Sequence, residues 1–272
     1  ARHAGSAVQL HAGAVADRHG RVVTLLAPSG GGKTTATIAL GRRGWGYVTD
    51  ELVIVDADLR VSPFEKPLSL VRGHSEAKGI AGPDEFGLGR CSDDLRLAAT
   101  VVLRRRPGVD AALRPLDRGE ALRELVDQSC ALLSLTDPLQ RLAAVAASGV
   151  WALEYSEADE AAGLLDEVVD AAPGRGFEAL PRTGAGSSDG WCRRAVLDAV
   201  GWPEGAAFIV DGHPVYVGAL ERELWLLLES ASSIAEVVEA LGAAGASGLD
   251  DRVVRALGLM AAAGLVRAPR HS

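Results

Sequence analysis

Asparagine is absent from the 272 residues of this chain, and lysine is rare. GTPases read guanine with an Asn-Lys-x-Asp segment, and eukaryote-type protein kinases bind a second metal ion through an asparagine, so both classes are excluded. Lysine occurs only at Lys33, Lys66 and Lys78, although Lys and Arg together number 28. Where a chain so rich in arginine keeps lysine, we expect its compact ammonium charge to be required.

Other features that the chain lacks narrow its class further. It has three cysteines, Cys91, Cys130 and Cys192, at spacings that suit neither a metal site nor a disulfide framework. No apolar run approaches the roughly 20 residues of a membrane span, and the first residues do not resemble a secretory signal. The formal net charge of −8 disfavours nucleic acid. We expect a cytoplasmic protein without a membrane or nucleic-acid partner.

The pattern of apolar residues predicts two domains joined by a linker. In the first, strands are predicted at 7–16, 21–27, 47–49, 52–55, 97–103 and 151–155, and helices at 33–43, 117–133, 137–148 and 157–171. Residues 71–94 show no pattern and are predicted to be a long loop. Residues 172–190 are rich in Gly and Pro and are predicted to be the linker, which gives domains 1–171 and 191–272.

A glycine-rich segment lies between the strand at 21–27 and the helix at 33–43. It reads Ala27-Pro28-Ser29-Gly30-Gly31-Gly32-Lys33-Thr34 and matches the Walker A pattern, with Ala in place of the first Gly. Glycines let backbone amides converge on phosphate oxygens, and the helix N-terminus adds positive potential. We expect Lys33 to reach the β- and γ-phosphates and the Thr34 hydroxyl to bind magnesium. ATP is the expected nucleotide.

The nucleotide-binding residues predicted from this segment run as one stretch. They are Ser29, Gly30, Gly31, Gly32, Lys33, Thr34 and Thr35.

An acidic pair, Asp50-Glu51, follows the strand at 47–49. Neighbouring carboxylates on an extended strand point in opposite directions, so one can contact Mg²⁺ while the other takes a proton from an attacking hydroxyl. An ordinary Walker B pair, with one acid on the metal and one positioning water for ATP hydrolysis, fits the same residues. From these residues alone, a kinase and an ATPase are supported about equally.

Four segments together resemble the catalytic domain of HPr kinase/phosphorylase. They are Leu10-His11-Ala12-Gly13, the loop from Ser29 to Thr34, the helix end Arg43-Gly44, and Tyr47-Val48-Thr49-Asp50-Glu51. The resemblance implies an α/β fold, namely a P-loop kinase domain of the HPr kinase/PEP carboxykinase-like type. It implies that Asp50 is the base toward the acceptor hydroxyl, that His11 helps to orient the acceptor or the carboxylate, and that Thr34 and Glu51 contact Mg²⁺.

The downstream residues refine this resemblance. Residues 63–70 look like those of shorter HPr-kinase-like enzymes from peptide natural-product clusters, some of which phosphorylate a ribosomally made precursor peptide. Glu76-Ala77-Lys78-Gly79-Ile80 only partly matches a family stretch that supplies another acid near the metal. Glu76 is therefore a further metal candidate, and the reverse, phosphate-removing reaction is not expected to follow from the resemblance.

Residues 191–272 resemble PqqD-like peptide-recognition domains, which are winged-helix-like. Short strands are predicted at 194–200, 206–210 and 214–217, followed by helices near 219–230, 233–243 and 250–264. The resemblance implies that this domain binds a leader or precursor peptide by adding a strand to a sheet edge. A structural or dimerising lobe is the second interpretation. DNA binding is the third interpretation. Residues 191–272 contain seven Arg and no Lys but ten Asp and Glu, and this negative balance disfavours DNA.

The sequence therefore predicts an ATP- and Mg²⁺-dependent kinase that phosphorylates Ser or Thr on a precursor peptide. Two alternatives remain open: a kinase of a small hydroxylated metabolite, and a nucleotide-gated module that binds peptide without transferring phosphate. Each of these functions is compatible with a homo-oligomer.

Overall fold

The computed structural model describes residues 7–64, 66–71, 78–171, 174, 176–184, 190–229, 233–242 and 248–269. The chain divides into two compact units. The first comprises Ala1–Thr136 and Arg141–Gly176, and the second comprises Asp137–Gln140 and Phe177–Ser272. None of the helices in the described part of the chain is long and apolar enough to cross a membrane.

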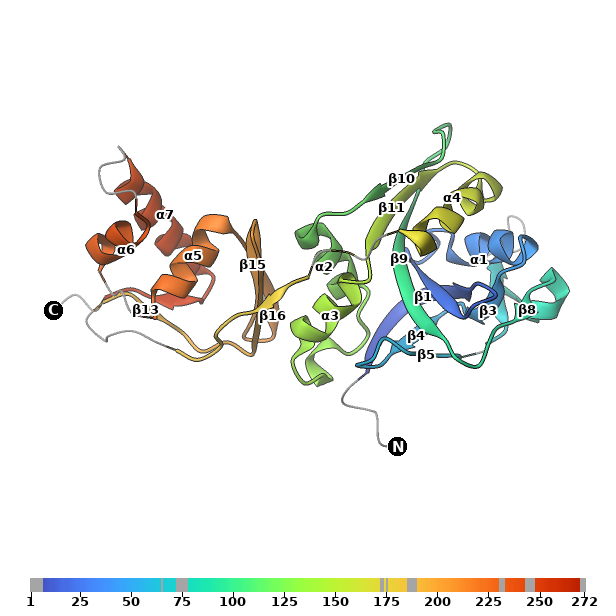
Figure 1. Ribbon diagram of the computed structural model, residues 1–272, viewed down its shortest axis with the longest axis horizontal. Coiled ribbons are helices and arrows are strands. Elements are labelled where there is room, and N and C mark those ends of the chain that lie inside the picture. The colour runs from blue at the N-terminus through green and yellow to red at the C-terminus, as the bar shows by residue number, and fades with distance from the viewer. Residues whose placement is uncertain are drawn as a thin grey trace. The chain divides into compact units, whose positions relative to one another are not determined.

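A nine-stranded sheet forms the centre of the first unit (Figure 1). Its main strands run in the order β10-β11-β9-β2-β1-β3-β8, with β4 paired to β1 and β5 paired to β4. Their bounds are β1 Val8–Ala16, β2 Arg21–Leu26, β3 Gly46–Thr49, β4 Leu52–Val55, β5 Val61–Ser62, β8 Gly89–Arg90, β9 Arg96–Arg105, β10 Ala112–Pro115 and β11 Val150–Tyr155.

Strand directions bring the predicted functional residues to one edge of this sheet. β2, β9 and β11 are mutually parallel, and β1 runs antiparallel to both β2 and β3. Ala12 of β1 pairs with Leu26 at the carboxyl end of β2, and Ala14 pairs with Thr49 at the carboxyl end of β3. His11, the loop after β2 and Asp50 after β3 therefore meet at the same edge.

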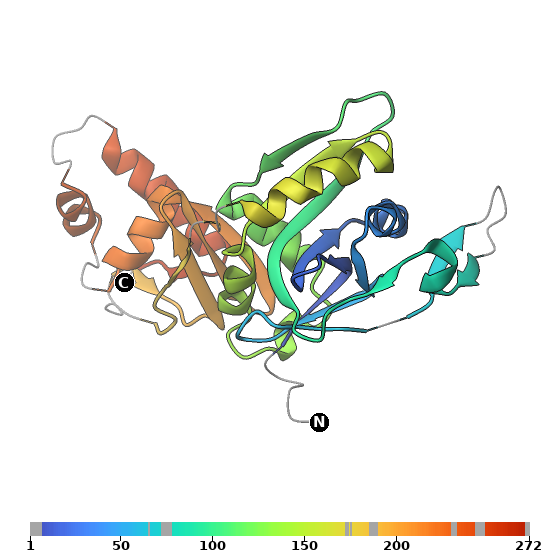
Figure 2. The same cartoon turned by 45° about the vertical axis from the view of Figure 1, so that its right-hand side comes forward.

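Two helices, α1 (Lys33–Arg42) and α4 (Ala158–Asp170), pack together over one face of the sheet (Figure 2). The core beneath them is apolar and includes the fully buried Leu25, Leu40 and Val101. α1 begins directly after the glycine-rich loop, so its packing fixes where the loop lies. The helices α2 (Arg118–Asp127) and α3 (Pro138–Ala146) follow β10 in the chain.

Two predictions in the first unit are wrong in part. The expected loop at 71–94 contains β7 (Lys78–Ala81), which pairs with β6 (Leu68–Val71), as well as a short 3₁₀ helix (Pro83–Phe86) and β8. These segments are too short and too rich in Gly and charge to show a period in sequence. The helix expected at 117–133 ends at Asp127, because the following backbone bonds to β1.

The backbone after α2 supports the strand that carries His11. The amide of His11 donates to the carbonyl of Gln128 at 2.8 Å, and the amide of Cys130 donates to the carbonyl of Gln9 at 2.9 Å. These bonds satisfy backbone groups of β1 that its neighbouring strands leave open. In a helix these amides and carbonyls would bond to one another along the helix axis and could not reach β1. The helix α2 therefore ends before the residues that pair with β1.

The second unit combines a four-stranded antiparallel sheet with three helices. The sheet order is β12-β14-β15-β16, and β13 pairs separately with β17. Phe208 of β15 and Trp225 of α5 form the centre of its core, with ring centroids 4.7 Å apart. The bounds are β12 Glu178–Ala179, β13 Cys192–Arg193, β14 Asp198–Trp202, β15 Gly205–Val210, β16 His213–Gly218, α5 Ala219–Leu227, α6 Ile234–Ala240, α7 Leu249–Ala262 and β17 Val266–Arg267.

The three predicted C-terminal helices are present, and Ser233 and Glu236 form a capping box at the start of α6. The first strand, expected at 194–200, lies instead at Asp198–Trp202. Part of the predicted linker is also structured, because β12 pairs with β14 as an outer strand of the sheet. The second unit therefore takes in residues from Phe177 onward rather than from 191.

A buried carboxylate organises the edge of the second unit. Asp198 is fully buried and accepts hydrogen bonds from the amides of Leu139 and Gln140 and from the side-chain amide of Gln140. These amides belong to the first turn of α3, so the carboxylate satisfies donors that the helix cannot pair itself. This contact explains why residues 137–140 group with the second unit.

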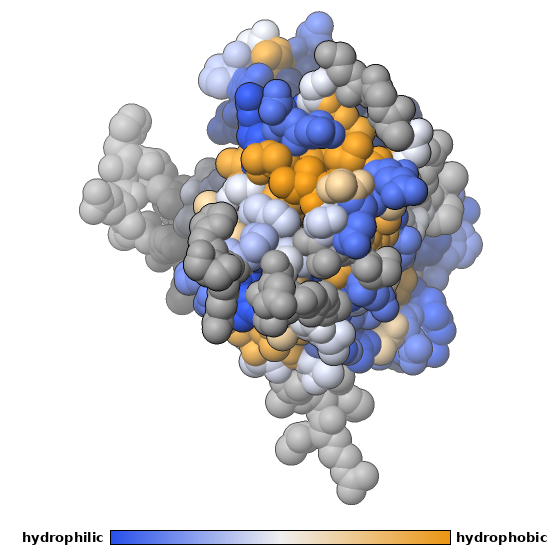
Figure 3. Space-filling model, turned by 90° about the vertical axis from the view of Figure 1, so that its left-hand side faces the viewer, coloured by the Kyte–Doolittle hydropathy of each residue, from blue (hydrophilic) through white to orange (hydrophobic). Residues whose placement is uncertain are grey.

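The surface of the second unit is not uniformly polar. Figure 3 shows an apolar area framed by hydrophilic residues on the left-hand side of the view in Figure 1. On α7, Leu259 and Val254 are exposed to 62% and 45%. Single exposed apolar residues are ordinary in proteins, so these two side chains alone do not define a site.

Candidate active site

The backbone of the glycine-rich loop between β2 and α1 depends on its glycines. Gly30 and Gly32 have positive φ angles of 79° and 94°, a region that favours glycine. A Cβ on Gly31 would lie 2.8 Å from the Cβ of Ala27 and 2.9 Å from the carbonyl oxygen of Pro28. All three glycines are thus required by the backbone path. Ser29 and Thr35 are exposed on either side of this turn.

Lys33 is the first residue of α1, and its side chain is almost completely buried. Its ammonium donates to the carbonyl of Ala27 at 2.6 Å and lies 3.3 Å from Nε2 of His11. A protonated lysine can only donate, so Nε2 accepts and the ring proton of a neutral His11 is on Nδ1. The lysine is thus held over the loop by acceptors that a phosphate could replace.

Burial and charge shift both pKa values in this pair. Burial lowers the pKa of Lys33, and the nearby charge of Asp50 opposes that shift. Burial also lowers the pKa of His11, and the charge of Lys33 lowers it further. The imidazole is therefore kept neutral beside a cation, which suits an acceptor or a positioning group better than a general acid.

The hydroxyl of Thr34 and the carboxylate of Asp50 are in direct contact. Thr34 Oγ1 donates to Asp50 Oδ2 at 2.7 Å, although the two residues come from different elements. The second carboxylate oxygen, Oδ1, is buried and has no hydrogen-bond partner among the described residues. Burial raises the pKa of Asp50, while the Thr34 bond and the charges of Lys33 and Lys66 oppose the rise.

Glu51 points to a different environment from that of Asp50. It is exposed and forms an ion pair with Lys66. The two adjacent carboxylates therefore have different partners, and it is Asp50 that lies against Thr34. Lys66 thus neutralises the outer acid while contributing positive charge toward the inner one.

The oxygen ligands here fit magnesium better than they fit a transition metal. Among the described residues, no group of three or more His, Cys, Asp or Glu side chains could hold a metal ion. Mg²⁺ does not require such a cage, because it commonly uses one or two protein oxygens together with water and substrate phosphates. The Thr34 hydroxyl and the Asp50 carboxylate, with its unpartnered oxygen, match that donor set.

Not every predicted residue joins this cluster. Glu76, the further metal candidate, lies outside the described residues, and the side chain of Lys78 does so as well. His11, Lys33, Thr34 and Asp50 are brought together, while Glu51 stands beside them.

Two residues near the cluster were not predicted. Gly13 makes room for it, since a Cβ there would lie 3.2 Å from Thr37 Oγ1 and 3.7 Å from Asp50 Oδ1. The Tyr155 hydroxyl is buried without a described partner, 2.8 Å from where a Cβ of Gly32 would lie. Gly13 belonged to the quoted motif and could have been noticed. No signal near 155 points to a loop more than 120 residues away in sequence.

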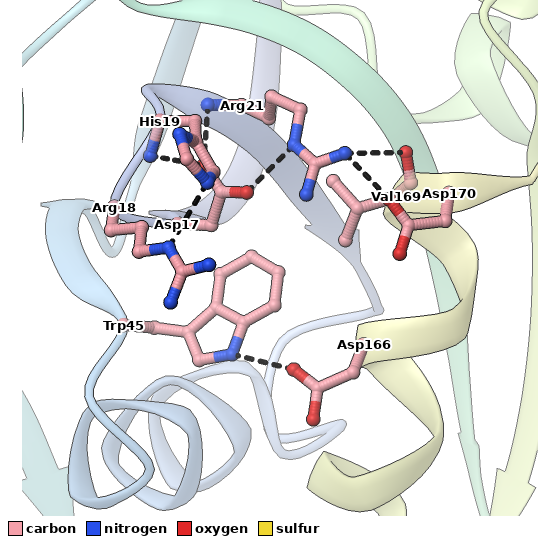
Figure 4. A network of polar contacts seen from close by, with 8 residues as sticks. All are labelled: Asp17, Arg18, His19, Arg21, Trp45, Asp166, Val169 and Asp170. Carbon is pink, nitrogen blue, oxygen red and sulfur yellow. Dashed lines mark hydrogen bonds and ion pairs between the residues drawn. The ribbon is translucent and has the colours of Figure 1, made fainter.

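A second polar region lies at the other end of α1 (Figure 4). Arg21 pairs with Asp17 at 2.7 Å and with Asp170 at 2.6 Å, while the Trp45 indole donates to Asp166 at 3.2 Å. These bonds join the β1–β2 turn, the residues after α1 and the end of α4. Because its charged side chains mainly pair with one another, we interpret this region as a structural brace.

Comparisons with known proteins add little to this geometry. No family model matches the chain, and no curated protein matches it. Among solved structures, the chain is similar to the HPr(Ser) kinase/phosphatase from Coxiella burnetii, at 16% identity and a TM-score of 0.31, over 60% of this chain and 88% of that one. A TM-score this low does not establish a shared fold.

Proposed function

We propose that the first unit binds ATP with Mg²⁺ and transfers the γ-phosphate to a hydroxyl group. The observation that carries the proposal is the Thr34–Asp50 contact at 2.7 Å beside Lys33, at the mouth of a glycine loop. Backbone amides of the loop would hold the phosphates, and Lys33 would exchange its carbonyl partners for phosphate oxygens. The choice of an alcohol as acceptor rests on the resemblance of the four sequence segments to HPr kinase.

The protein's own groups divide the work of the proposed reaction. The acceptor oxygen forms a bond to the γ-phosphorus as the bond to the bridging oxygen breaks, and ADP leaves. Asp50 takes the proton of the acceptor hydroxyl, a role that its raised pKa favours. His11 keeps Lys33 in place. The resemblance gives Glu51 as a second Mg²⁺ ligand beside Thr34, and to take that role Glu51 would have to leave its ion pair with Lys66. Bound there, Mg²⁺ would neutralise charge on the phosphates.

Hydrolysis of ATP is the second candidate, because the Thr34–Asp50 hydrogen bond fits it as well as it fits transfer. A carboxylate bonded to the loop hydroxyl is placed for a Walker B role on the metal side. If Asp50 is a ligand of Mg²⁺, Asp50→Asn weakens binding of MgATP. If Asp50 is the base, the same variant binds MgATP normally and loses transfer.

A direct experiment separates these functions. The protein is incubated with MgATP and a precursor peptide encoded beside its gene, and the products are analysed by mass spectrometry. A gain of one phosphate on the peptide, lost in Asp50→Asn, supports the kinase. Inorganic phosphate without a modified peptide supports hydrolysis, and ATP binding without any product supports a nucleotide-gated binding module.

We further propose that the second unit binds the leader part of such a peptide. β16 is the outer strand of the sheet next to β15, and its side chains are exposed or half-buried. An extended peptide could pair with its open edge. Hydrogen exchange offers a matched control within one sheet: a bound peptide should protect amides of β16 and leave those of β12, at the opposite edge, unchanged. Equal protection of both edges, or of neither, would contradict strand addition.

A metabolite kinase makes a different prediction. It would transfer phosphate to a small hydroxylated compound with no leader peptide, and the presence of a peptide bound at β16 would not change the rate. Comparing transfer to a peptide with and without its leader segment therefore tests the proposed role of the second unit.

A further inference from the structure

A pocket of about 310 Å³ opens beside the phosphate loop in the first unit. One wall is a single face of α1, formed by Thr35, Ile38, Ala39 and Arg42, which follow the i, i+3, i+4, i+7 spacing of a helix side. Gly32 of the loop also lines it. The pocket thus begins at the last glycine of the cradle and extends along the helix.

The opposite wall comes from two other parts of the same unit. Tyr155 and Arg105 come from the ends of β11 and β9, and Glu157 and Asp159 lie at the start of α4. Phe86, from the 3₁₀ helix, also lines the pocket and packs against the apolar cluster that contains Ile38. The lining therefore combines the aromatic rings of Phe86 and Tyr155, aliphatic groups, two guanidinium groups and two carboxylates.

This chemistry does not suit a second phosphate site. The two carboxylates offset the positive charge of the two guanidinium groups, and the apolar surface of Phe86 and Ile38 makes no polar contact with phosphate. An aromatic ring suits a flat heterocycle, and carboxylates can accept hydrogen bonds from sugar hydroxyls. The volume lies at the lower end of the range for small-molecule pockets, roughly 300–1,000 Å³.

The pocket is separate from the group formed by His11, Lys33, Thr34 and Asp50. Lys33, Thr34, His11 and Asp50 do not line it, whereas Gly32 and Thr35 do. Thr34 and Thr35 are successive helix residues, so their side chains point about 100° apart around the helix axis. Thr34 faces Asp50, and Thr35 faces the pocket.

We propose that this pocket binds the nucleoside of the triphosphate, with the base against Phe86 and Ile38 and the ribose toward the start of α4. The inference rests on the proposed function, because it needs phosphates held by the loop. It adds a specific site to that function: the α1 face at 35–42 recognises the nucleoside, while residues 30–34 recognise the phosphates.

The first test compares ATP with inorganic tripolyphosphate, each with Mg²⁺, by calorimetry on the full chain. Both should bind, and ATP should bind at least about tenfold more tightly, since stacking of a base is a substantial contribution. Equal affinities would overturn the nucleoside pocket while leaving the phosphate site intact. Binding of neither probe would overturn both the pocket and the proposed function.

The second test fills the pocket. Ala158→Trp places a large ring at the pocket wall, and Glu160→Trp places the same ring two residues away, outside the lining. We expect Ala158→Trp to weaken ATP about tenfold without changing the affinity for tripolyphosphate, and Glu160→Trp to change neither. Loss of both ligands in Ala158→Trp, with an unchanged melting temperature, would contradict the assignment.

Phe86→Ala provides an independent variant that removes volume. It should also weaken ATP selectively, by about tenfold, while tripolyphosphate binds as it does to the unmodified chain. Thermal unfolding of each variant identifies any general loss of structure, because a fold defect would weaken both probes together. An unchanged affinity of Phe86→Ala for ATP would overturn the proposed stacking.

Discussion

The two ends of helix α1 carry polar groups of opposite character. At its start, the Asp50 carboxylate and the Tyr155 hydroxyl each leave a buried oxygen without a described partner. Beyond its end, Arg21 is paired with two aspartates, and Asp166 accepts from Trp45. Both regions use aspartates beside cations, yet of the two, within the described part of the chain, only the first has buried polar atoms without a hydrogen-bond partner.

The two regions also shift the pKa of an aspartate in opposite directions. At Asp50, burial dominates and raises the pKa. At Asp17, burial alone would raise the pKa, but hydrogen bonds from Arg21 and from the His19 amide outweigh it and lower the pKa. A carboxylate fully served by donors stabilises the fold. A buried carboxylate that lacks hydrogen-bond donors costs stability. Such a group is retained most readily where a ligand supplies the missing contact.

The largest difference between the two ends should appear in nucleotide binding. Lys33→Met removes the buried ammonium with little change in volume and should weaken MgATP about 100-fold, because a charged partner of phosphate is lost. Arg43→Met, beyond the end of the same helix, should change the affinity less than twofold. Calorimetry of both variants makes the comparison, and similar losses would show that the two ends do not differ in role.

Gly32→Ala should have the next largest effect. The new methyl group would be strained at a φ of 94° and would press on the Tyr155 hydroxyl. We expect about a tenfold loss of MgATP affinity, since left-handed backbone costs roughly 1–2 kcal/mol for a residue with a Cβ.

Adding Tyr155→Phe to Gly32→Ala should recover part of that loss, because the contact goes while the backbone strain stays. Tyr155→Phe alone should raise the melting temperature or leave it unchanged, as the hydroxyl has no described partner. A clear fall in melting temperature for Tyr155→Phe alone would show that the hydroxyl makes a stabilising bond.

Stability against pH should separate the two aspartates by sign. Because the folded pKa of Asp50 is raised, its charged form costs stability, and this cost appears as pH rises from the ordinary aspartate range through the folded pKa. Asp50→Asn should therefore melt a few degrees higher than the unmodified chain at pH 7.

Asp17→Asn should show the reverse. The folded pKa of Asp17 is lowered, so its contribution is present above the unfolded pKa and is lost as pH falls through the folded pKa. This variant should melt lower than the unmodified chain at pH 7, and both differences should fade in acid. Shifts of the same sign for the two variants would refute the contrast.

The smallest effect is expected at the brace. Trp45→Phe keeps the aromatic packing but removes the indole N–H that donates to Asp166 at 3.2 Å. The free energy of unfolding should fall by about 1 kcal/mol, with MgATP affinity unchanged. Denaturant titration measures the first quantity and calorimetry the second. A loss of affinity would mean that the brace reaches the nucleotide site.

Regular elements with a clear period were predictable. β1, β2, α1, β3, β4, β9, β11 and α4 lie within a few residues of their predicted positions, because each has an apolar side to bury. Short elements were not predictable. β5, β10 and β12 carry no usable period over two to four residues, and they become strands only because a neighbouring strand offers them an edge.

The sequence by itself determined the position and composition of the glycine-rich loop at the carboxyl end of β2. Three glycines, a lysine and a threonine between a strand and a helix can be read in order, because the path of such a loop depends on local backbone geometry. It also determined that Asp50 and Glu51 would face different ways. Both conclusions need only neighbours in the chain.

Tertiary structure alone decided which acid meets Thr34 and what surrounds the loop. The antiparallel β1 brings His11 to Lys33, the path of β3 brings Asp50 to Thr34, and β11 brings Tyr155 beneath Gly32. These contacts depend on strand order and on the packing of α1 against α4. Such long-range pairings come from burying a shared core, and no short stretch of sequence encodes that core.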